Sequence, residues 1–215
     1  MTPAPVDIPP EAWADAAYAL GLWTGWALLH SALASHRFKN AMEVALGPTR
    51  WALYPLAYTV VSLWTFSVVW LKEPSLPQTI WLVGGAGALL LYFLQAAGLA
   101  LVAWAGFTVN GTKMLGLRQL VDTLRGRIAD EPDPKRDFRS TGAYGLVRHP
   151  MHVGGTLFLF CAPHMTLGSL VFACFAAVYF LYGAWMEERR LSQSLGPVLA
   201  DYARRVPMYL PKLKF

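Results

Sequence analysis

The stretch "HPMHVGGTLFLFCAPHMTLGSLVFACFAAVYFLYGAWM", residues 149–186, contains no Asp, Glu, Lys or Arg. A helix needs about 20 predominantly apolar residues to cross a bilayer, so this stretch is too long for one membrane span. Pro163 and His164 interrupt it near its middle. The stretch therefore predicts a helical hairpin at 150–186, which makes the last two crossings of a membrane.

Three further stretches upstream, 16–36, 51–71 and 74–112, contain no Asp, Glu, Lys or Arg. They predict single membrane spans at 12–35, 51–71 and 78–105. With the hairpin, they predict an all-α fold, an integral membrane helical bundle of about five transmembrane segments. Hydrophobic residues make up 55% of the chain, which fits a membrane protein better than a soluble one. We expect residues 1–215 to form a single membrane domain.

The distribution of charge predicts the orientation of the spans. Lys and Arg gather in the segments 106–149 and 187–215, whereas the segment before the first span carries only acidic residues. Lys72 is the single cation expected on the opposite side of the membrane. The positive-inside rule therefore predicts an outside N-terminus, a cytoplasmic loop at 106–149 and a cytoplasmic C-terminal segment. The expected location is a bacterial inner membrane.

The sequence "LGLRQLVDTLRGR", residues 115–127, places Leu and Val near helical spacing with charged residues between them. This pattern predicts an amphipathic helix at the cytoplasmic interface, in contact with membrane lipid. The membrane asymmetry accounts for the net charge of +5. Because no soluble basic domain with base-reading residues is visible, we expect no nucleic-acid partner. The sequence also offers no tight His and Cys cluster, so no metal site is predicted.

The loop "YGLVRH", residues 144–149, leads directly into the hairpin. Pro150 suits the first position of a helix, and His149 before it is biased away from helical dihedral angles. The loop should therefore feed a helix N-terminus, which favours an anion. Arg148 adds a positive charge and a fork that fits a carboxylate. The alternative is that Arg148 and His149 are interfacial anchors on lipid phosphates.

Glu187 and Glu188 lie where the last span leaves the membrane. Ionisable residues at such a depth indicate function, and a partner for them is expected. A fold-back of the C-terminal segment would bring the Glu pair and Arg205 toward the Arg148 loop. The alternative for this segment is a solvated charged face.

Two stretches together carry a resemblance. "GAYGLVRHPMHVGG" (142–155) and "EERRL…LGPVLADYARRVPMYLP" (187–211) resemble the isoprenylcysteine carboxyl methyltransferase superfamily. Its members carry an R-H-P-x-Y-x-G loop, a Glu-Glu pair and a Y-x-x-R-V-P-x-x-x-P tail. "HSALASHRFK" (30–39), "GLRQL" (116–120) and "APHMTLGSLVFA" (162–173) are more similar to the methanethiol S-methyltransferases, and the first half also resembles NnrU proteins.

The resemblance implies a membrane-embedded enzyme that uses S-adenosylmethionine and lacks a Rossmann domain. Its expected catalytic residues are Glu188 and Arg205. In-line methyl transfer depends on alignment and on exclusion of water, with a Glu balancing the sulfonium and an Arg steadying an anionic acceptor. The residues expected to bind the cofactor are Gln119, Tyr144, Leu146, Val147, Arg148, His149, Pro150, Glu187 and Tyr202.

The expected acceptor is a small or lipophilic thiol, with the carboxyl group of a prenyl-cysteine as the alternative within the same class. His152 stands where the superfamily motif has Tyr, and Gly155 stands where a bulky aromatic residue is common. Both positions would line the acceptor side, so the motif leaves the acceptor open.

Two alternatives come from other classes of protein. One is a catalytically silent membrane scaffold. The other is an NnrU-like haem-binding protein or isomerase, whose candidate ligands are His30, His149, His152 and His164.

Overall fold

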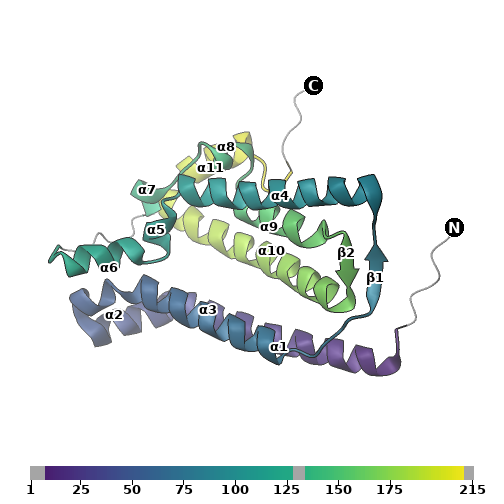
Figure 1. Ribbon diagram of the computed structural model, residues 1–215. Helices are drawn as coiled ribbons and strands as arrows, with labels where there is room; N and C mark the ends of the chain where they lie inside the picture. Colours follow the sequence, from purple (N-terminus) through teal and green to yellow (C-terminus); the bar gives the residue numbers. More distant parts are fainter. Residues whose placement is uncertain (1–7, 128–133, 211–215) are drawn as a thin grey trace. The chain divides into compact units, whose positions relative to one another are not determined.

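The computed structural model describes residues 8–127 and 134–210 and is mostly helical (Figure 1). The chain divides into two compact units. The first unit comprises Met1–Gly21, Pro74–Thr108 and Arg139–Phe215, and the second comprises Leu22–Glu73 and Val109–Phe138. The expectation of one membrane domain stays a prediction.

The elements follow one another in this order: α1 (Pro10–Ala34), α2 (His36–Trp51), α3 (Tyr54–Lys72), β1 (Thr79–Leu82), α4 (Gly85–Thr108), α5 (Gly111–Met114), α6 (Leu117–Leu124), α7 (Pro134–Asp137), α8 (Ala143–Leu146), α9 (Pro150–Phe160), β2 (His164–Thr166), α10 (Leu167–Leu195) and α11 (Pro197–Arg205). Within the described residues, α3, α4 and α10 are long and apolar enough to cross a membrane. A helical membrane protein is thereby confirmed, while the count of five spans stays a prediction.

The hairpin predicted at 150–186 has arms of unequal length. Helix α9 has 11 residues, or about 16 Å at 1.5 Å per residue, and is too short to cross the hydrocarbon core alone. Helix α10 has 29 residues and runs back along α9. The chain reverses at Pro163 and His164, where the sequence indicated the break.

Glycines allow the helices of the first unit to pack closely. A Cβ atom added to Gly98 of α4 would lie 2.6 Å from the carbonyl oxygen of Gly154 of α9. Only glycine fits at such a crossing without displacing backbone. On the other side of α9, a Cβ atom on Gly155 would lie 3.0 Å from the ring of Phe180. Helix α9 is therefore held between α4 and α10.

A small antiparallel sheet was not expected from the sequence. Strand β1 pairs with β2, with Thr79 opposite Thr166 and Leu82 opposite His164. Helix α4 consequently begins at Gly85, which has a φ of +57°, rather than near Gln78. Periodicity does not separate a short apolar strand from the first turn of a helix, and the pairing joins segments far apart in the chain.

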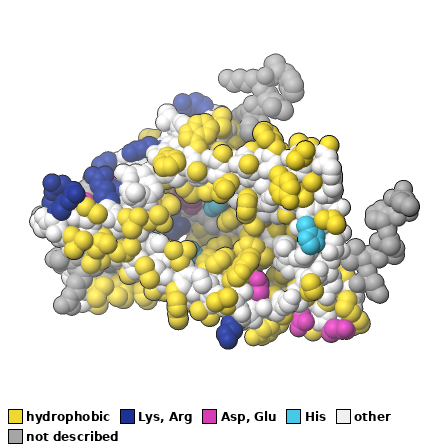
Figure 2. All heavy atoms as spheres, viewed as in Figure 1, with side chains coloured by type: hydrophobic (Ala, Val, Ile, Leu, Met, Phe, Trp, Pro, Cys, Tyr) yellow, Lys and Arg dark blue, Asp and Glu magenta, His cyan; other side chains and the backbone are white. Residues whose placement is uncertain are grey.

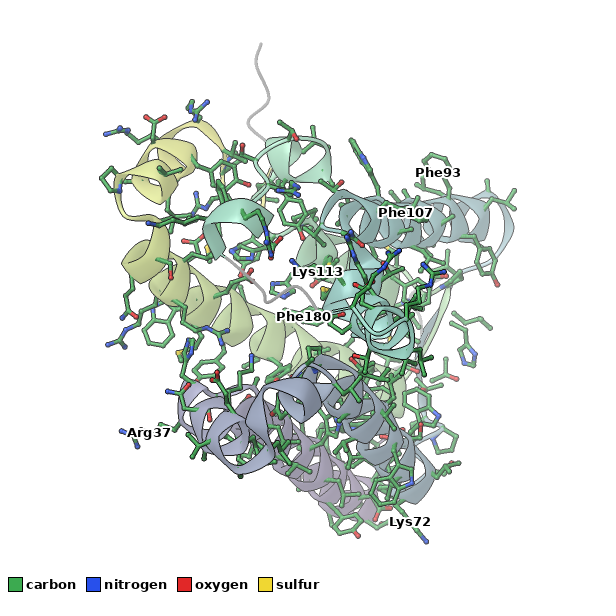
Figure 3. The ribbon with its side chains drawn as sticks, turned by 90° about the vertical axis from the view of Figure 1, so that its left-hand side faces the viewer. Arg37, Lys72, Phe93, Phe107, Lys113 and Phe180 are labelled. Carbon is green, nitrogen blue, oxygen red and sulfur yellow. The ribbon has the colours of Figure 1, made fainter. Side chains whose placement is uncertain are left out.

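The second unit contains an antiparallel pairing of α1 with α3. The indole nitrogen of Trp23 donates a 2.8 Å hydrogen bond to Glu73, and the hydroxyl of Tyr54 donates to the carbonyl of Leu33. Arg37 and Lys72 therefore lie near opposite ends of this helix pair, and both are labelled in Figure 3. Their separation agrees with the predicted orientation, which stays a prediction.

Helix α6 also belongs to the second unit and packs on α3. Gly116, with a φ of +81°, lies so close to the backbone of Leu56 that no Cβ fits there. Leu117, Val121 and Leu124 are exposed on α6, as an amphipathic helix requires. Its place at the cytoplasmic interface stays a prediction.

Hydrophobic side chains cover the visible face of α4 (Figure 2). Phe93 and Phe107 point away from this helix (Figure 3) and are 69% and 85% exposed. An apolar surface of this kind suits contact with lipid.

Candidate active site

The site is built where the loop before α9 meets the segment after α11. Residue His149 precedes the first turn of α9, and Pro150 occupies the first position of the helix, as the sequence predicts. The backbone N–H of Arg148 donates to the carbonyl of Pro207 at 2.8 Å, and that of His149 donates to Met208 at 3.3 Å. The two stretches that carry the superfamily motif are therefore in direct backbone contact.

The side chain of Arg148 joins three segments. Its Nε and Nη2 atoms donate to the two carboxylate oxygens of Glu188 at 2.6 and 3.1 Å. Its Nη1 atom donates to the carbonyl oxygens of Ala203 and Val206 at 3.2 and 2.8 Å. A bidentate pair of this kind is among the stronger interactions of charged side chains. Arg148 therefore fixes the end of α10 and the end of α11 against the loop.

The imidazole of His149 lies between the two carboxylates of α10. Its Nε2 atom is 3.1 Å from Glu188 Oε1, and its Nδ1 atom is 3.7 Å from Glu187 Oε2. His149 is buried, whereas the side chain of Glu187 is 50% exposed. With Arg148, the cluster holds one permanent cation and two carboxylates, so it favours binding of a further positive charge.

Two tyrosines connect α11 to the loop. The hydroxyl of Tyr202 donates a 2.6 Å hydrogen bond to the carbonyl of Tyr144. Burial raises the pKa of Tyr202 to about 12. Burial, with the negative charge of Glu187, raises the pKa of Tyr144 to about 12 as well. Both phenols therefore stay protonated at physiological pH and can act as hydrogen-bond donors.

The remaining predicted residues differ in their surroundings. Val147 and Pro150 are fully buried and hold the loop in place, while Leu146 is 48% exposed. Arg205 is exposed and pairs with Asp201 of the same helix at 3.0 Å. Gln119 belongs to the second unit, where its Nε2 atom donates to the carbonyl of Lys113 at 3.0 Å. Among the predicted residues, the structure thus joins Arg148 and His149 to Glu188, His149 to Glu187, and Tyr144 to Tyr202.

Three aromatic rings that the site predictions did not include lie beside this cluster. The ring of His152 stacks on that of His149 at 5.4 Å between centroids and on that of Phe180 at 5.0 Å. The ring of Tyr209 lies 5.9 Å from that of His149. Tyr209 occupies an unspecified position of the tail motif, and Phe180 is one of many aromatic residues in an apolar span. Of these three residues, only His152 could have been singled out from the sequence, because it departs from the superfamily motif.

The surroundings of two histidines bear on the haem alternative. The Nε2 atom of His30 lies 2.6 Å from the hydroxyl of Tyr58, and its Nδ1 atom lies 2.9 Å from that of Ser62. Both nitrogens of His30 are thus engaged, as is the Nε2 atom of His149. An iron ligand needs a free ring nitrogen, so these contacts count against His30 as a haem ligand.

Comparison with curated proteins identifies the family of the chain. The chain is 34% identical over 195 residues to a methanethiol S-methyltransferase of Pseudomonas deceptionensis, covering 90% of this chain and 71% of the relative. This chain belongs to the methanethiol S-methyltransferase family. A relative of the same name from Mycobacterium tuberculosis is 31% identical and covers 86% of this chain and 74% of its own length. The resemblance predicted from the motifs is confirmed, and the protein is a methyltransferase.

A third methanethiol S-methyltransferase, from Crocosphaera subtropica, is 31% identical over 193 residues, which make up 89% of this chain and 73% of that protein. No family model matches the chain. No solved structure matches it. The family assignment therefore rests on these relatives, which match 86% to 90% of this chain.

Proposed function

We propose that this protein transfers a methyl group from S-adenosylmethionine to a small thiol such as methanethiol, by in-line displacement. The observation that carries the proposal is the contact of Arg148 and His149 with Glu188, which joins the two motif stretches at one place. The name shared by the relatives supports a thiol as acceptor and favours it over a prenyl-cysteine carboxyl group.

The residues of the cluster fit a sulfonium donor. The carboxylate of Glu187 is half exposed beside His149, and it would balance the positive sulfur. The first turn of α9 has no side-chain cap at His149, so its backbone N–H groups would bind the donor's carboxylate. When bound, S-adenosylmethionine supplies a methyl group on a positively charged sulfur.

The other residues position this site. Arg148 holds Glu188 in a fixed orientation, and Tyr202 anchors α11 to the loop through Tyr144. We assign Leu146 to apolar contact with the donor, and Val147 and Pro150 to the support behind it. Alignment and exclusion of water lower the barrier of this reaction more than acid–base chemistry on the donor does.

Two assignments concern residues outside the buried cluster. Arg205 would steady an anionic acceptor, because its exposed pair with Asp201 is weak and easily exchanged. Gln119 is 4% exposed, and its Oε1 atom has no hydrogen-bond partner in the described part of the chain. Its contact with the donor stays a prediction from the resemblance.

A methyl-transfer assay with labelled S-adenosylmethionine tests the proposal. Purified protein is given thiols of increasing size and a prenyl-cysteine analogue, and binding of S-adenosylhomocysteine is followed by calorimetry. We expect saturable binding and the highest rate with the smallest thiols. Methylation of the prenyl-cysteine analogue alone would contradict the thiol assignment, and absence of binding would contradict the cofactor.

A further inference from the structure

Two buried polar atoms beside His149 have no hydrogen-bond partner among the described residues. They are the Nδ1 atom of His152 and the hydroxyl of Tyr209. Buried polar groups in native proteins are nearly always paired, so an unpaired one needs an explanation such as a bound water or ligand. Because both rings lie against His149, the two atoms indicate a ligand position next to the cluster.

Packing rather than hydrogen bonding holds the imidazole of His152. Its ring is nearly parallel to that of His149, at 4°, and to that of Phe180, at 7°. The absence of a side chain at Gly155 makes room for Phe180 in this stack. The orientation of His152 is therefore fixed by packing, while its Nδ1 atom has no hydrogen-bond partner among the described residues.

We propose that His152 is the catalytic base of thiol methylation and that Tyr209 hydrogen-bonds to the acceptor sulfur. This inference rests on the proposed function. His152 Nδ1 accepts the proton of the thiol, and the S–H electron pair remains on sulfur. A sulfur electron pair forms the new S–C bond while the donor's S–CH₃ bond breaks, and that bond's electrons stay on the donor sulfur. The proton on His152 then passes to water.

Thiol chemistry explains why a base is useful here. The thiolate is the reactive nucleophile, and a thiol with a pKa of about 8.5, like that of cysteine, is mostly protonated at neutral pH. A positioned base contributes about 100-fold to 10,000-fold to such a step. The superfamily motif has Tyr where this chain has His152, and a phenol accepts protons poorly at neutral pH. Among the charged groups of the site, Glu187 and Glu188 lie against His149, and Arg148 pairs with Glu188. His152 stacks on the imidazole of His149.

The test compares two acceptors of similar size and different acidity, ethanethiol and trifluoroethanethiol. In His152→Ala, we expect kcat with ethanethiol at pH 7 to fall about 100-fold or more. The loss should be much smaller with the more acidic thiol, and it should shrink as pH rises. Added imidazole should restore part of the rate. S-adenosylhomocysteine affinity should not change.

Three further variants sharpen the test. His152→Asn keeps a polar group of similar shape, and it should show the same acidity-dependent loss if His152→Ala does not fold. In Tyr209→Phe, kcat should fall about tenfold. The fall should again be larger with ethanethiol than with trifluoroethanethiol. His164→Ala is the matched control, because His164 is exposed on β2 and contacts Thr79, and its rates should equal those of the wild type.

Equal losses with both thiols would assign His152 a structural role and overturn the proposal, and so would a wild-type rate in His152→Ala. A wild-type rate in Tyr209→Phe would overturn the part assigned to Tyr209. Failure of the proposed function has a different signature, because the wild-type protein would then methylate neither thiol.

Discussion

At the scale of single residues, Arg148 connects the loop before α9 to α10 and to the end of α11. Its guanidinium donates to Glu188 and to two carbonyl oxygens at the end of α11, and its backbone N–H donates to Pro207. Removing it would leave Glu188 without its bidentate partner and would release the C-terminal segment. The loss of one partner of a shielded ion pair costs more than the loss of an exposed pair.

Arg148→Ala is expected to weaken binding of S-adenosylhomocysteine at least tenfold, which corresponds to about 1.4 kcal/mol. Lysine should not replace it, because an ammonium cannot form the bidentate fork. Arg118→Ala is the control, since Arg118 is an exposed residue of α6 whose pair with Asp122 is long at 3.8 Å. Calorimetric titration measures the affinity of both variants for S-adenosylhomocysteine. Equal affinities would argue against the role assigned to Arg148.

Arg205 and Arg204 provide a matched pair on α11. Both are exposed and both pair with Asp201, at 3.0 and 2.9 Å. If Arg205 steadies the acceptor, Arg205→Ala should lower turnover at least 100-fold, as loss of an electrostatic stabiliser does, whereas Arg204→Ala should leave turnover unchanged. The methyl-transfer rate at saturating thiol decides this, and equal rates would show Arg205 to be a surface charge.

Among the site residues, the sequence allowed the charged ones to be predicted. Charged groups at a membrane edge need partners, so Arg148 and Glu188 could be predicted as members of one site. The contacts of Tyr209 and Phe180 could not be predicted, because nothing in an aromatic residue's own position shows which ring it meets. The exposure of Arg205 depends on the rotation of α11, which its sequence does not determine.

At the scale of elements, the crossing of α4 and α9 positions the loop. This crossing depends on Gly98 and Gly154, where backbone approaches backbone. Any displacement of α9 would move its N-terminus, and with it Arg148 and His149. The helix crossing and the site are therefore mechanically linked.

Gly98→Ala is expected to destabilise the protein by about 1–3 kcal/mol, because the added methyl group overlaps the carbonyl of Gly154. Gly183→Ala is the control in α10, where nothing lies within 4 Å of an added Cβ atom. It should be neutral or slightly stabilising, because Ala is the better helix former. Thermal unfolding in detergent measures both, and equal midpoints would contradict close packing of α4 on α9.

The contribution of Tyr202, which joins α11 to α8, to the stability of the folded protein depends on pH. Tyr202 has a pKa of about 12 in the folded protein, against 10.0 ordinarily. Between pH 10 and 12 the unfolded chain loses this proton first, so the stabilisation is complete below pH 10 and is lost as pH rises toward 12. The melting temperature of Tyr202→Phe should therefore fall less steeply over this range than that of the wild type. Parallel curves would contradict burial of the phenol.

The long apolar helices could be predicted from runs without charge, since a lipid-facing helix satisfies its own backbone hydrogen bonds. The sheet of β1 and β2 could not, because its strands lie far apart in the sequence and each is too short to show a period. The short arm of the hairpin was also missed. Hydropathy located the break at Pro163 but did not show that α9 would be much shorter than α10.

At the scale of the whole molecule, the membrane character follows from α3, α4 and α10. An N-terminus outside and a cytoplasmic C-terminal segment would give the site access to a donor made in the cytoplasm. The family of the chain could be predicted because its motifs are visible in the sequence. The structure then brings the two motif stretches together at Arg148 and Glu188. The acceptor was harder to predict from the sequence. His152 and Gly155 depart from the superfamily motif at the positions that are expected to face the acceptor.

The measurement that tests the central claim most directly is label transfer from S-adenosylmethionine to methanethiol by the wild type and by Glu188→Gln. Glutamine has nearly the same shape but lacks the charge that pairs with Arg148 and His149. We predict labelled dimethyl sulfide from the wild type, and at least a 100-fold lower yield from a variant that still folds. Equal yields from the two proteins, or no labelled thioether from the wild type, would contradict the account.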